Sequence, residues 1–297
     1  MGEARTRDLK ATWLATKAAG RFSTRLAGRF ASRLWFTPWP VPLGDGARAK
    51  QAAWLATTEP ITFDVGTHRV AGFTAGTGPT VLLVHGWGET AATLGGFIEP
   101  LVRTGHRVVG IDLPGHGKTS YGRTNIFEQT HAIRAVAEQV GGLDAIVAHS
   151  MGGYVTSVAI GEGLGAGAIV LIAPASDVDH VMGKFQTLFA LPPRAMAGLR
   201  ADIERRFGGD VWERLNIRSH ATRFSAPALI VHDRDDDQID VTESEALARA
   251  WPRARTLYTS GLGHDKPTRD PNVIAGATDF LVEMLRPVEV GLVTADF

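Results

Sequence analysis

A single serine, Ser150, stands at the junction between an apolar run typical of a buried β-strand and a run compatible with a helix. A sharp strand-to-helix turn at a serine lifts the hydroxyl clear of the backbone and aims the helix N-terminus at any anion formed there. The usual pattern is G-x-S-x-G, because the two backbones nearly touch at this turn. Here Gly152 keeps the trailing glycine, and Ala148 replaces the leading one by adding a methyl group. The segment predicts a nucleophilic serine, and the alternative is an ordinary strand–loop–helix junction.

Two later segments could supply the partners that a serine nucleophile needs. A serine hydroxyl is weakly nucleophilic at neutral pH, so it requires a base to take its proton and a third group to orient that base. The apolar strand predicted at 227–232 leads into an acidic turn at 233–240, and the strand predicted at 255–260 leads into His264. Serine, acid and histidine therefore follow one another along the chain, each at the C-terminal end of a strand.

Strands and helices alternate in the manner of a mostly parallel sheet flanked by helices. Eight strands are predicted, near 61–66, 68–75, 80–85, 107–112, 143–149, 168–173, 227–232 and 255–260. Helices are predicted near 90–103, 126–140, 151–162, 242–250 and 272–285. The first two strands should pair as an antiparallel hairpin at the sheet edge, because only a short turn containing Gly66 separates them.

The chain resembles the α/β-hydrolase family, in particular its serine esterases and lipases, over roughly residues 60–286. Four motifs carry the resemblance in the family's order: His85–Gly88, Asp112–Gly117, the serine segment 148–153, and Gly261–His264 with Pro271 seven residues later. The resemblance implies an α/β fold with a mostly parallel sheet of about eight strands, flanked by helices and covered by a small helical cap.

By this resemblance Ser150 is the nucleophile and His264 the general base, while the backbone N–H groups of Trp87 and Met151 form the oxyanion hole. The implied reaction is cleavage of a small acyl ester through an acyl-enzyme on Ser150. Thioesterase, lactonase, acyltransferase and carbon–carbon bond hydrolase stay open as alternatives, because all can share the same triad. A non-catalytic binding protein on this fold would require a missing triad member, and none is missing.

The triad acid is selected by spacing from three adjacent aspartates. In the family the acid commonly sits three residues after a glycine at the strand end and three residues before an apolar residue. Asp233 stands at the glycine position, and Ile239 is the apolar residue. This spacing selects Asp236, with Asp235 as the alternative.

Residues 56–297 are expected to form the hydrolase domain, interrupted at about 175–224 by a helical insertion that includes a helix at 194–206. In the family this position holds a cap over the active site. Five apolar residues of the insertion could line an acyl pocket or pack the cap onto the body: Val181, Met182, Phe185, Leu188 and Phe189.

Residues 1–55 are predicted to form a basic, amphipathic arm. The first 50 residues hold ten Lys or Arg against three acids, a net charge of +7 that leaves −7 for the rest of a chain whose total is zero. Arginines at 21, 25, 29 and 33 form a stripe beside an apolar stripe of Phe22, Leu26, Phe30 and Leu34. Residues 13–39 could lie on an anionic membrane surface. Docking of the apolar stripe on the acidic body is the favoured alternative.

Composition excludes several other classes of protein. The zero net charge gives no indication of nucleic-acid binding, and the absence of cysteine excludes disulfides and thiolate metal sites. No apolar run reaches the ~18–20 residues needed to span a bilayer, and the N-terminus lacks the apolar core of a signal peptide. The chain is therefore expected to be cytoplasmic, or peripheral at the membrane if the arm binds lipid.

Two motifs that suggest a cofactor or metal are set aside. The run at 112–119 resembles a phosphate-binding loop, but Asp112 replaces its first glycine and Pro114 removes a backbone N–H. The alternating aspartates from Asp233 resemble a calcium loop, but Gln238 and Ser244 replace its glycine and its glutamate. We therefore expect no cofactor and no metal.

Overall fold

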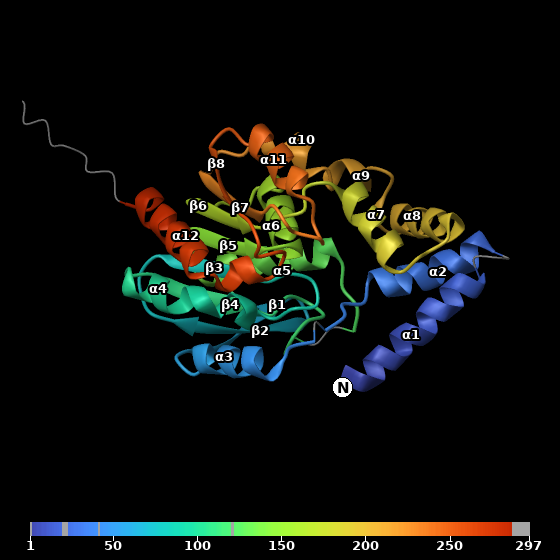
Figure 1. Ribbon diagram of the computed structural model, residues 1–297, viewed down its shortest axis with the longest axis horizontal. Helices are drawn as coiled ribbons and strands as arrows, with labels where there is room; N and C mark the ends of the chain where they lie inside the picture. Colours follow the sequence, from blue (N-terminus) through green and yellow to red (C-terminus); the bar gives the residue numbers. More distant parts are fainter. Residues whose placement is uncertain (1, 20–22, 41, 120–121, 287–297) are drawn as a thin grey trace, which may run out of the picture.

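The computed structural model describes residues 2–19, 23–40, 42–119 and 122–286, and an eight-stranded sheet lies at its centre (Figure 1). The strands are β1 (Glu59–Val65), β2 (His68–Ala75), β3 (Thr80–Val84), β4 (Arg107–Ile111), β5 (Ala145–His149), β6 (Ala168–Ile172), β7 (Ala228–Asp233) and β8 (Ala254–Thr259). Their order across the sheet is β1-β2-β4-β3-β5-β6-β7-β8. β1 and β2 pair antiparallel, as do β2 and β4, and the remaining pairs are parallel. The predicted strands, the edge hairpin and the fold class are confirmed.

Helices cover both faces of the sheet because the central strands are apolar on both sides. In β3, Leu82 and Val84 face one core, while Val81 and Leu83 face the other. The first core is closed by α5 (Ile126–Gln139), α6 (Met151–Gly161) and α11 (Val241–Ala250). The second is closed by the 3₁₀ helix η1 (Ala91–Phe97), α4 (Ile98–Arg103) and α12 (Pro271–Met284).

The prediction of one helix at 90–103 is wrong in one respect, because this segment is divided into η1 and α4. Pro100 has no N–H to donate to an earlier carbonyl, so it fits only in the first turn of a helix, and α4 begins two residues before it. The glycines at 95 and 96 also disfavour a continuous helix. Gly95 has a second role, because a Cβ there would overlap the Trp54 side chain of α3 (Asp45–Leu55).

Four helices occupy the insertion between β6 and β7. They are α7 (Val178–Leu188), α8 (Pro193–Phe207), α9 (Val211–Arg214) and α10 (Ile217–Ala221). The helix predicted at 194–206 corresponds to α8, with Pro193 at its first turn, where a missing N–H costs nothing. In Figure 1 α7, α8 and α9 lie beside the sheet, with α8 next to the N-terminal arm, whereas α10 lies beside α11.

The N-terminal arm packs on these insertion helices. It contains α1 (Gly2–Ala19), α2 (Thr24–Trp35) and α3, and the Ser23 hydroxyl caps α2 by accepting from the Leu26 N–H at 3.2 Å. α2 runs against α8 so closely that a Cβ on Gly28 would lie 2.5 Å from the carbonyl carbon of Gly198. The arm docks on the hydrolase domain, as in the alternative favoured above, with α2 against α8 and α3 against η1.

The buried face of α2 differs from the predicted apolar stripe. It consists of Ala27, Gly28, Ala31, Ser32 and Leu34, whereas the Leu26 side chain is 45% exposed. Small residues face α8 because a close helix crossing leaves no room for larger ones. The stripe positions at 21 and 22 lie outside the described residues.

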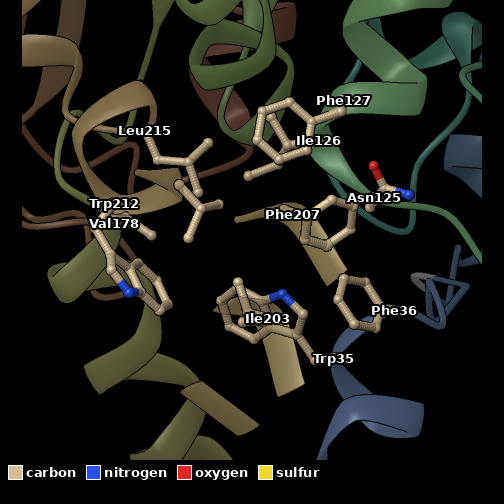
Figure 2. Close-up of a pocket in the computed structure, with 11 residues that line it drawn as sticks. Trp35, Phe36, Asn125, Ile126, Phe127, Val178, Ile203, Phe207, Trp212 and Leu215 are labelled. Carbon is tan, nitrogen blue, oxygen red and sulfur yellow. The ribbon is translucent and has the colours of Figure 1, made fainter. Parts of the chain in front are cut away.

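The end of α2 meets the insertion at an apolar cavity (Figure 2). Trp35 and Phe36 line it from the arm, Phe127 from the start of α5, and Phe207 and Trp212 from the insertion. The Phe36 carbonyl also accepts a hydrogen bond from the Thr124 N–H at 2.8 Å, which ties the arm to the loop before α5. No helix within the described ranges is long and apolar enough to cross a membrane.

We predict that Gly28→Ala destabilises the fold by about 1–3 kcal/mol, because the added methyl group forces α2 and α8 apart. Gly183→Ala is the matched control, since a Cβ there meets nothing within 4 Å on helix α7. The control should be up to about 1 kcal/mol more stable than the wild type, because alanine favours a helix. Urea unfolding measures both variants, and equal stability of Gly28→Ala and the wild type would contradict the close crossing.

Candidate active site

Ser150 lies on a strained turn between β5 and α6. Its backbone angles are φ 51° and ψ −121°, a conformation that a non-glycine residue rarely adopts. The turn is held by the Ser150 N–H, which donates to the Ile172 carbonyl at 2.8 Å. Gly152 is required because a Cβ there would overlap the carbonyl oxygens of Val84 and His85. The strand, turn and helix predicted around the serine are therefore present.

Three side chains meet in line at the carboxyl ends of the parallel strands. The Ser150 Oγ lies 2.9 Å from His264 Nε2, and His264 Nδ1 lies 2.7 Å from Asp236 Oδ2. The structure brings Asp236, and not Asp235, to the histidine. The side chains of Asp236 and His264 are 0% and 6% exposed, so water competes little for this contact.

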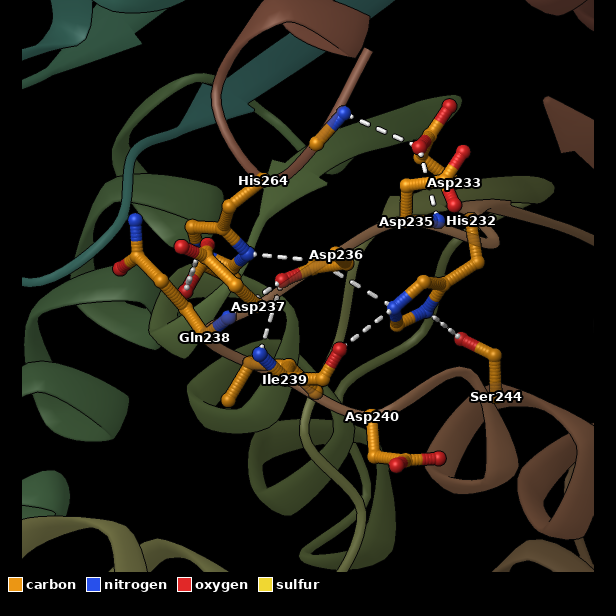
Figure 3. A network of polar contacts seen from close by, with 12 residues as sticks. His232, Asp233, Asp235, Asp236, Asp237, Gln238, Ile239, Asp240, Ser244 and His264 are labelled. Carbon is orange, nitrogen blue, oxygen red and sulfur yellow. Dashed lines mark hydrogen bonds and ion pairs between the residues drawn. The ribbon is translucent and has the colours of Figure 1, made fainter. Parts of the chain in front are cut away.

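Asp236 is held as a carboxylate by four contacts (Figure 3). Its Oδ1 accepts the N–H groups of Gln238 and Ile239 at 2.8 and 2.9 Å, while its Oδ2 also lies 3.3 Å from Nε2 of His232. Burial alone would raise the pKa of Asp236. Hydrogen bonds from His232 and His264 outweigh burial and hold the pKa well below its usual range. The acid therefore stays charged beside the histidine.

The other aspartates of this turn build the loop that carries the histidine. Asp233 is fully buried, and its two oxygens accept from the N–H groups of Asp235, Leu262 and Gly263 and from the Thr259 hydroxyl. Asp235 accepts from the Gly261 N–H at 2.8 Å. These carboxylates therefore fix the approach to His264 by accepting backbone donors.

The loop after β3 lies against the serine. A Cβ on Gly86 would be 3.1 Å from the Cβ of Ser150, which places Trp87, the next residue, beside the turn. The Trp87 ring packs edge-on against His116, with centroids 5.3 Å apart. Within the described residues, no protein acceptor takes the backbone N–H of Trp87 or Met151. Both donors are available for a ligand.

Sequence reasoning assigned no role to three buried groups beside this site. Glu89 and His149 form a pair with Oε2 and Nδ1 3.0 Å apart, and His232 supports Asp236 from behind. Burial alone would raise the pKa of Glu89, but His149 outweighs it and lowers the pKa to about 2. The serine segment contained His149, yet its partner is 60 positions away, and no spacing rule connects them.

Of the five apolar residues suggested for an acyl pocket, Val181 is partly buried against the core, and the other four differ in their surroundings. Met182 is buried in the core, and Leu188 is 77% exposed. Phe185 packs edge-on against Trp35, with ring centroids 4.9 Å apart, and Phe189 packs at a tilt against Trp39, with ring centroids 4.5 Å apart. None of them lines the cavity in Figure 2. Phe185 and Phe189 therefore join the cap to the arm, and a role for this group of residues in an acyl pocket stays a prediction.

The lowered pKa values of Glu89 and Asp236 predict a loss of stability in acid. A carboxyl whose folded pKa is depressed stabilises the fold above its unfolded pKa, and this stabilisation is lost as the pH falls toward the folded value. For Glu89 the window runs from about pH 4.5 down to about pH 2. Melting temperatures measured across this window should fall less steeply for Glu89→Gln than for the wild type. The control is Glu59→Gln, at an exposed glutamate of β1, whose melting temperatures should follow those of the wild type. If the melting temperatures of all three proteins fall in parallel with pH, the lowered pKa of Glu89 is contradicted.

The model of the alpha/beta hydrolase family matches residues 81–289, and the chain belongs to this family. Among curated proteins, pimeloyl-[acyl-carrier protein] methyl ester esterase of Nitrosomonas europaea is 23% identical over 231 residues, 64% of this chain and 90% of that protein.

Among solved structures, a thermophilic esterase from Thermogutta terrifontis superposes with a TM-score of 0.60 at 17% identity, covering 77% of this chain and all of that one. A membrane phospholipase A superposes with a TM-score of 0.61 at 21% identity, covering 81% and 90%. These structures share the fold of this chain.

Proposed function

We propose that this protein is a serine hydrolase that cleaves a carboxylic ester through an acyl-enzyme on Ser150. The line of contacts from Ser150 Oγ through His264 to the Asp236 carboxylate, with the serine on a strained turn, carries the proposal. The esterase named among the curated relatives supports an ester as the substrate.

In the first half of the reaction, His264 Nε2 takes the Ser150 proton as Oγ attacks the ester carbonyl carbon. Asp236 accepts the Nδ1–H of His264, which leaves Nε2 unprotonated and ready to act as the base. The carbonyl oxygen becomes an oxyanion, for which the N–H groups of Trp87 and Met151 are the proposed donors. The tetrahedral intermediate collapses, and the alcohol leaves with the proton from His264.

In the second half, water attacks the acyl-enzyme and gives a proton to His264. The second tetrahedral intermediate collapses, the carboxylic acid leaves, and the proton returns to Ser150. The position of Met151 at the N-terminus of α6 favours negative charge at this point, because the helix dipole presents its positive end there.

Labelling with a fluorophosphonate probe tests the proposal directly. We expect stoichiometric labelling of the wild-type protein at Ser150, located by peptide mass spectrometry, together with turnover of p-nitrophenyl esters. A protein that lacks both labelling and turnover would instead fit the non-catalytic alternative.

A further inference from the structure

A buried chain of contacts joins the loop after β3 to the backbone of His264. Glu89 Oε2 accepts the Gly86 N–H at 2.7 Å and lies 3.0 Å from His149 Nδ1. On the other side of the ring, His149 Nε2 lies 3.2 Å from the carbonyl oxygen of His264. The Glu89 and His149 side chains are 8% and 1% exposed. The proposed oxyanion loop and the proposed general base therefore share one support.

The partners of His149 determine its protonation. One ring nitrogen faces a carboxylate and the other a carbonyl oxygen, and neither of these groups can donate a hydrogen bond. Two hydrogen bonds donated to these groups require a proton on each nitrogen, so the arrangement fits a cationic ring. His85, nearby, shows the opposite case, because its Nε2 accepts the Leu113 N–H at 2.9 Å and so bears no proton.

The charges around His149 favour the cation. Burial alone would lower the pKa of His149, but Glu89 outweighs burial and raises it. The titratable groups that face the ring are Glu89, His264, Asp265 and His85. His85 is kept neutral, since burial lowers its pKa.

A metal ion does not explain this cluster. Ligand atoms of His149, His264 and Asp265 lie within 4.8 Å of one another. However, each of the four histidine ring nitrogens already has a hydrogen-bond partner, so no lone pair is free for an ion.

We propose that Glu89 and His149 are a positioning pair for the hydrolytic site, in which a buried ion pair fixes the loop carrying Trp87 and the backbone of His264. This inference rests on the proposed serine hydrolase function. The pair also has an electrostatic effect, because the His149 ring lies 5.0 Å from the His264 ring, centroid to centroid. A cation there disfavours a second positive charge on His264, while Glu89 lies on the opposite side of His149 and keeps the pair neutral overall.

One single variant and one double variant test the pair in the full chain. His149→Asn removes the cation and leaves Glu89 as an uncompensated anion, which favours protonated His264. We expect kcat to fall on the order of 10- to 100-fold with little change in KM, because a small misplacement of reacting groups has this effect. The acid limb of the kcat/KM profile should move to higher pH.

The double variant Glu89→Gln/His149→Asn removes both charges, so its acid limb should return toward the wild-type position while kcat stays low. A purely structural role would lower stability without moving the acid limb. His106→Asn is the matched control, because His106 is also buried but precedes β4, at the opposite end of the strands from the site. It should keep the wild-type pH profile.

A second measurement observes the ring of His149 directly in the wild type. In histidine-labelled protein at pH 8, nitrogen NMR should show one ring protonated at both positions, assigned to His149 by its loss in His149→Asn. A neutral His149 at pH 8, or an unmoved acid limb in an active His149→Asn enzyme, would overturn the proposal. Absence of all ester hydrolysis in the wild type would instead refute the proposed function, and the NMR result would still decide the ion pair.

Discussion

Ser150→Ala is expected to lower the turnover of p-nitrophenyl esters on the order of 10⁴- to 10⁶-fold while leaving the fold intact. The hydroxyl oxygen is the only heavy atom removed, and it contacts His264 Nε2 at 2.9 Å. Its loss therefore eliminates the nucleophile without opening the core. Steady-state kinetics on purified protein measures the loss, and circular dichroism checks the fold. Removing His264 as well should add little, because residues that act as a unit are not additive.

Ser157→Ala provides the matched control on the same helix. Ser157 is buried in α6 and donates its hydroxyl to the Gly153 carbonyl at 2.9 Å, so this change also removes one buried hydroxyl. It should keep turnover within a fewfold of the wild type. Turnover near the wild-type value in Ser150→Ala would refute the proposed mechanism.

Asp236→Asn is expected to lower turnover on the order of 10⁴-fold, because an amide in place of the carboxylate favours the wrong tautomer of His264. The same change at Asp235 should have a small effect. Its Oδ2 accepts only the Gly261 N–H, and an asparagine oxygen can still accept that bond. The two variants remove the same charge from neighbouring residues, so kcat and thermal stability measured for both separate a catalytic role from a general loss of charge.

Asp237→Asn, at an exposed side chain of the same turn, is a second control and should behave as the wild type. A large loss in Asp235→Asn with normal activity in Asp236→Asn would contradict this arrangement. It would show that Asp235, and not Asp236, is the acid that contacts His264.

Local patterns predicted most of the sheet and the meeting of Ser150, Asp236 and His264. The hydrophobic pattern of a strand and the turn at the serine can each be recognised from a few neighbouring residues. In a parallel sheet the carboxyl ends of successive strands then come together. The selection of Asp236 over Asp235 came from the family's spacing, with Asp233 at the glycine position and Ile239 as the apolar residue. These features depend on short stretches of sequence.

The contacts that sequence reasoning missed join residues far apart in the chain. The buried face of α2 is decided by α8, so the small residue Gly28 is buried and Leu26 is not. Nothing in the sequence distinguished Glu89 from the other acidic residues, because its contact with His149 forms only in the folded protein. Phe185 and Phe189 suggested a pocket because their aromatic partners in the arm could not be identified from the insertion alone.

The docking of the arm has a consequence for synthesis on the ribosome. The Trp13 indole N–H donates to the Phe189 carbonyl at 2.7 Å, and these two residues are 176 positions apart. At about 5–20 residues per second, the arm emerges roughly 10–30 s before its partner helices do. During that interval its small-residue face and tryptophans lack the surface that covers them in the finished protein. The arm can therefore reach its final place only after translation has passed α8, so its docking is a late step of folding during synthesis.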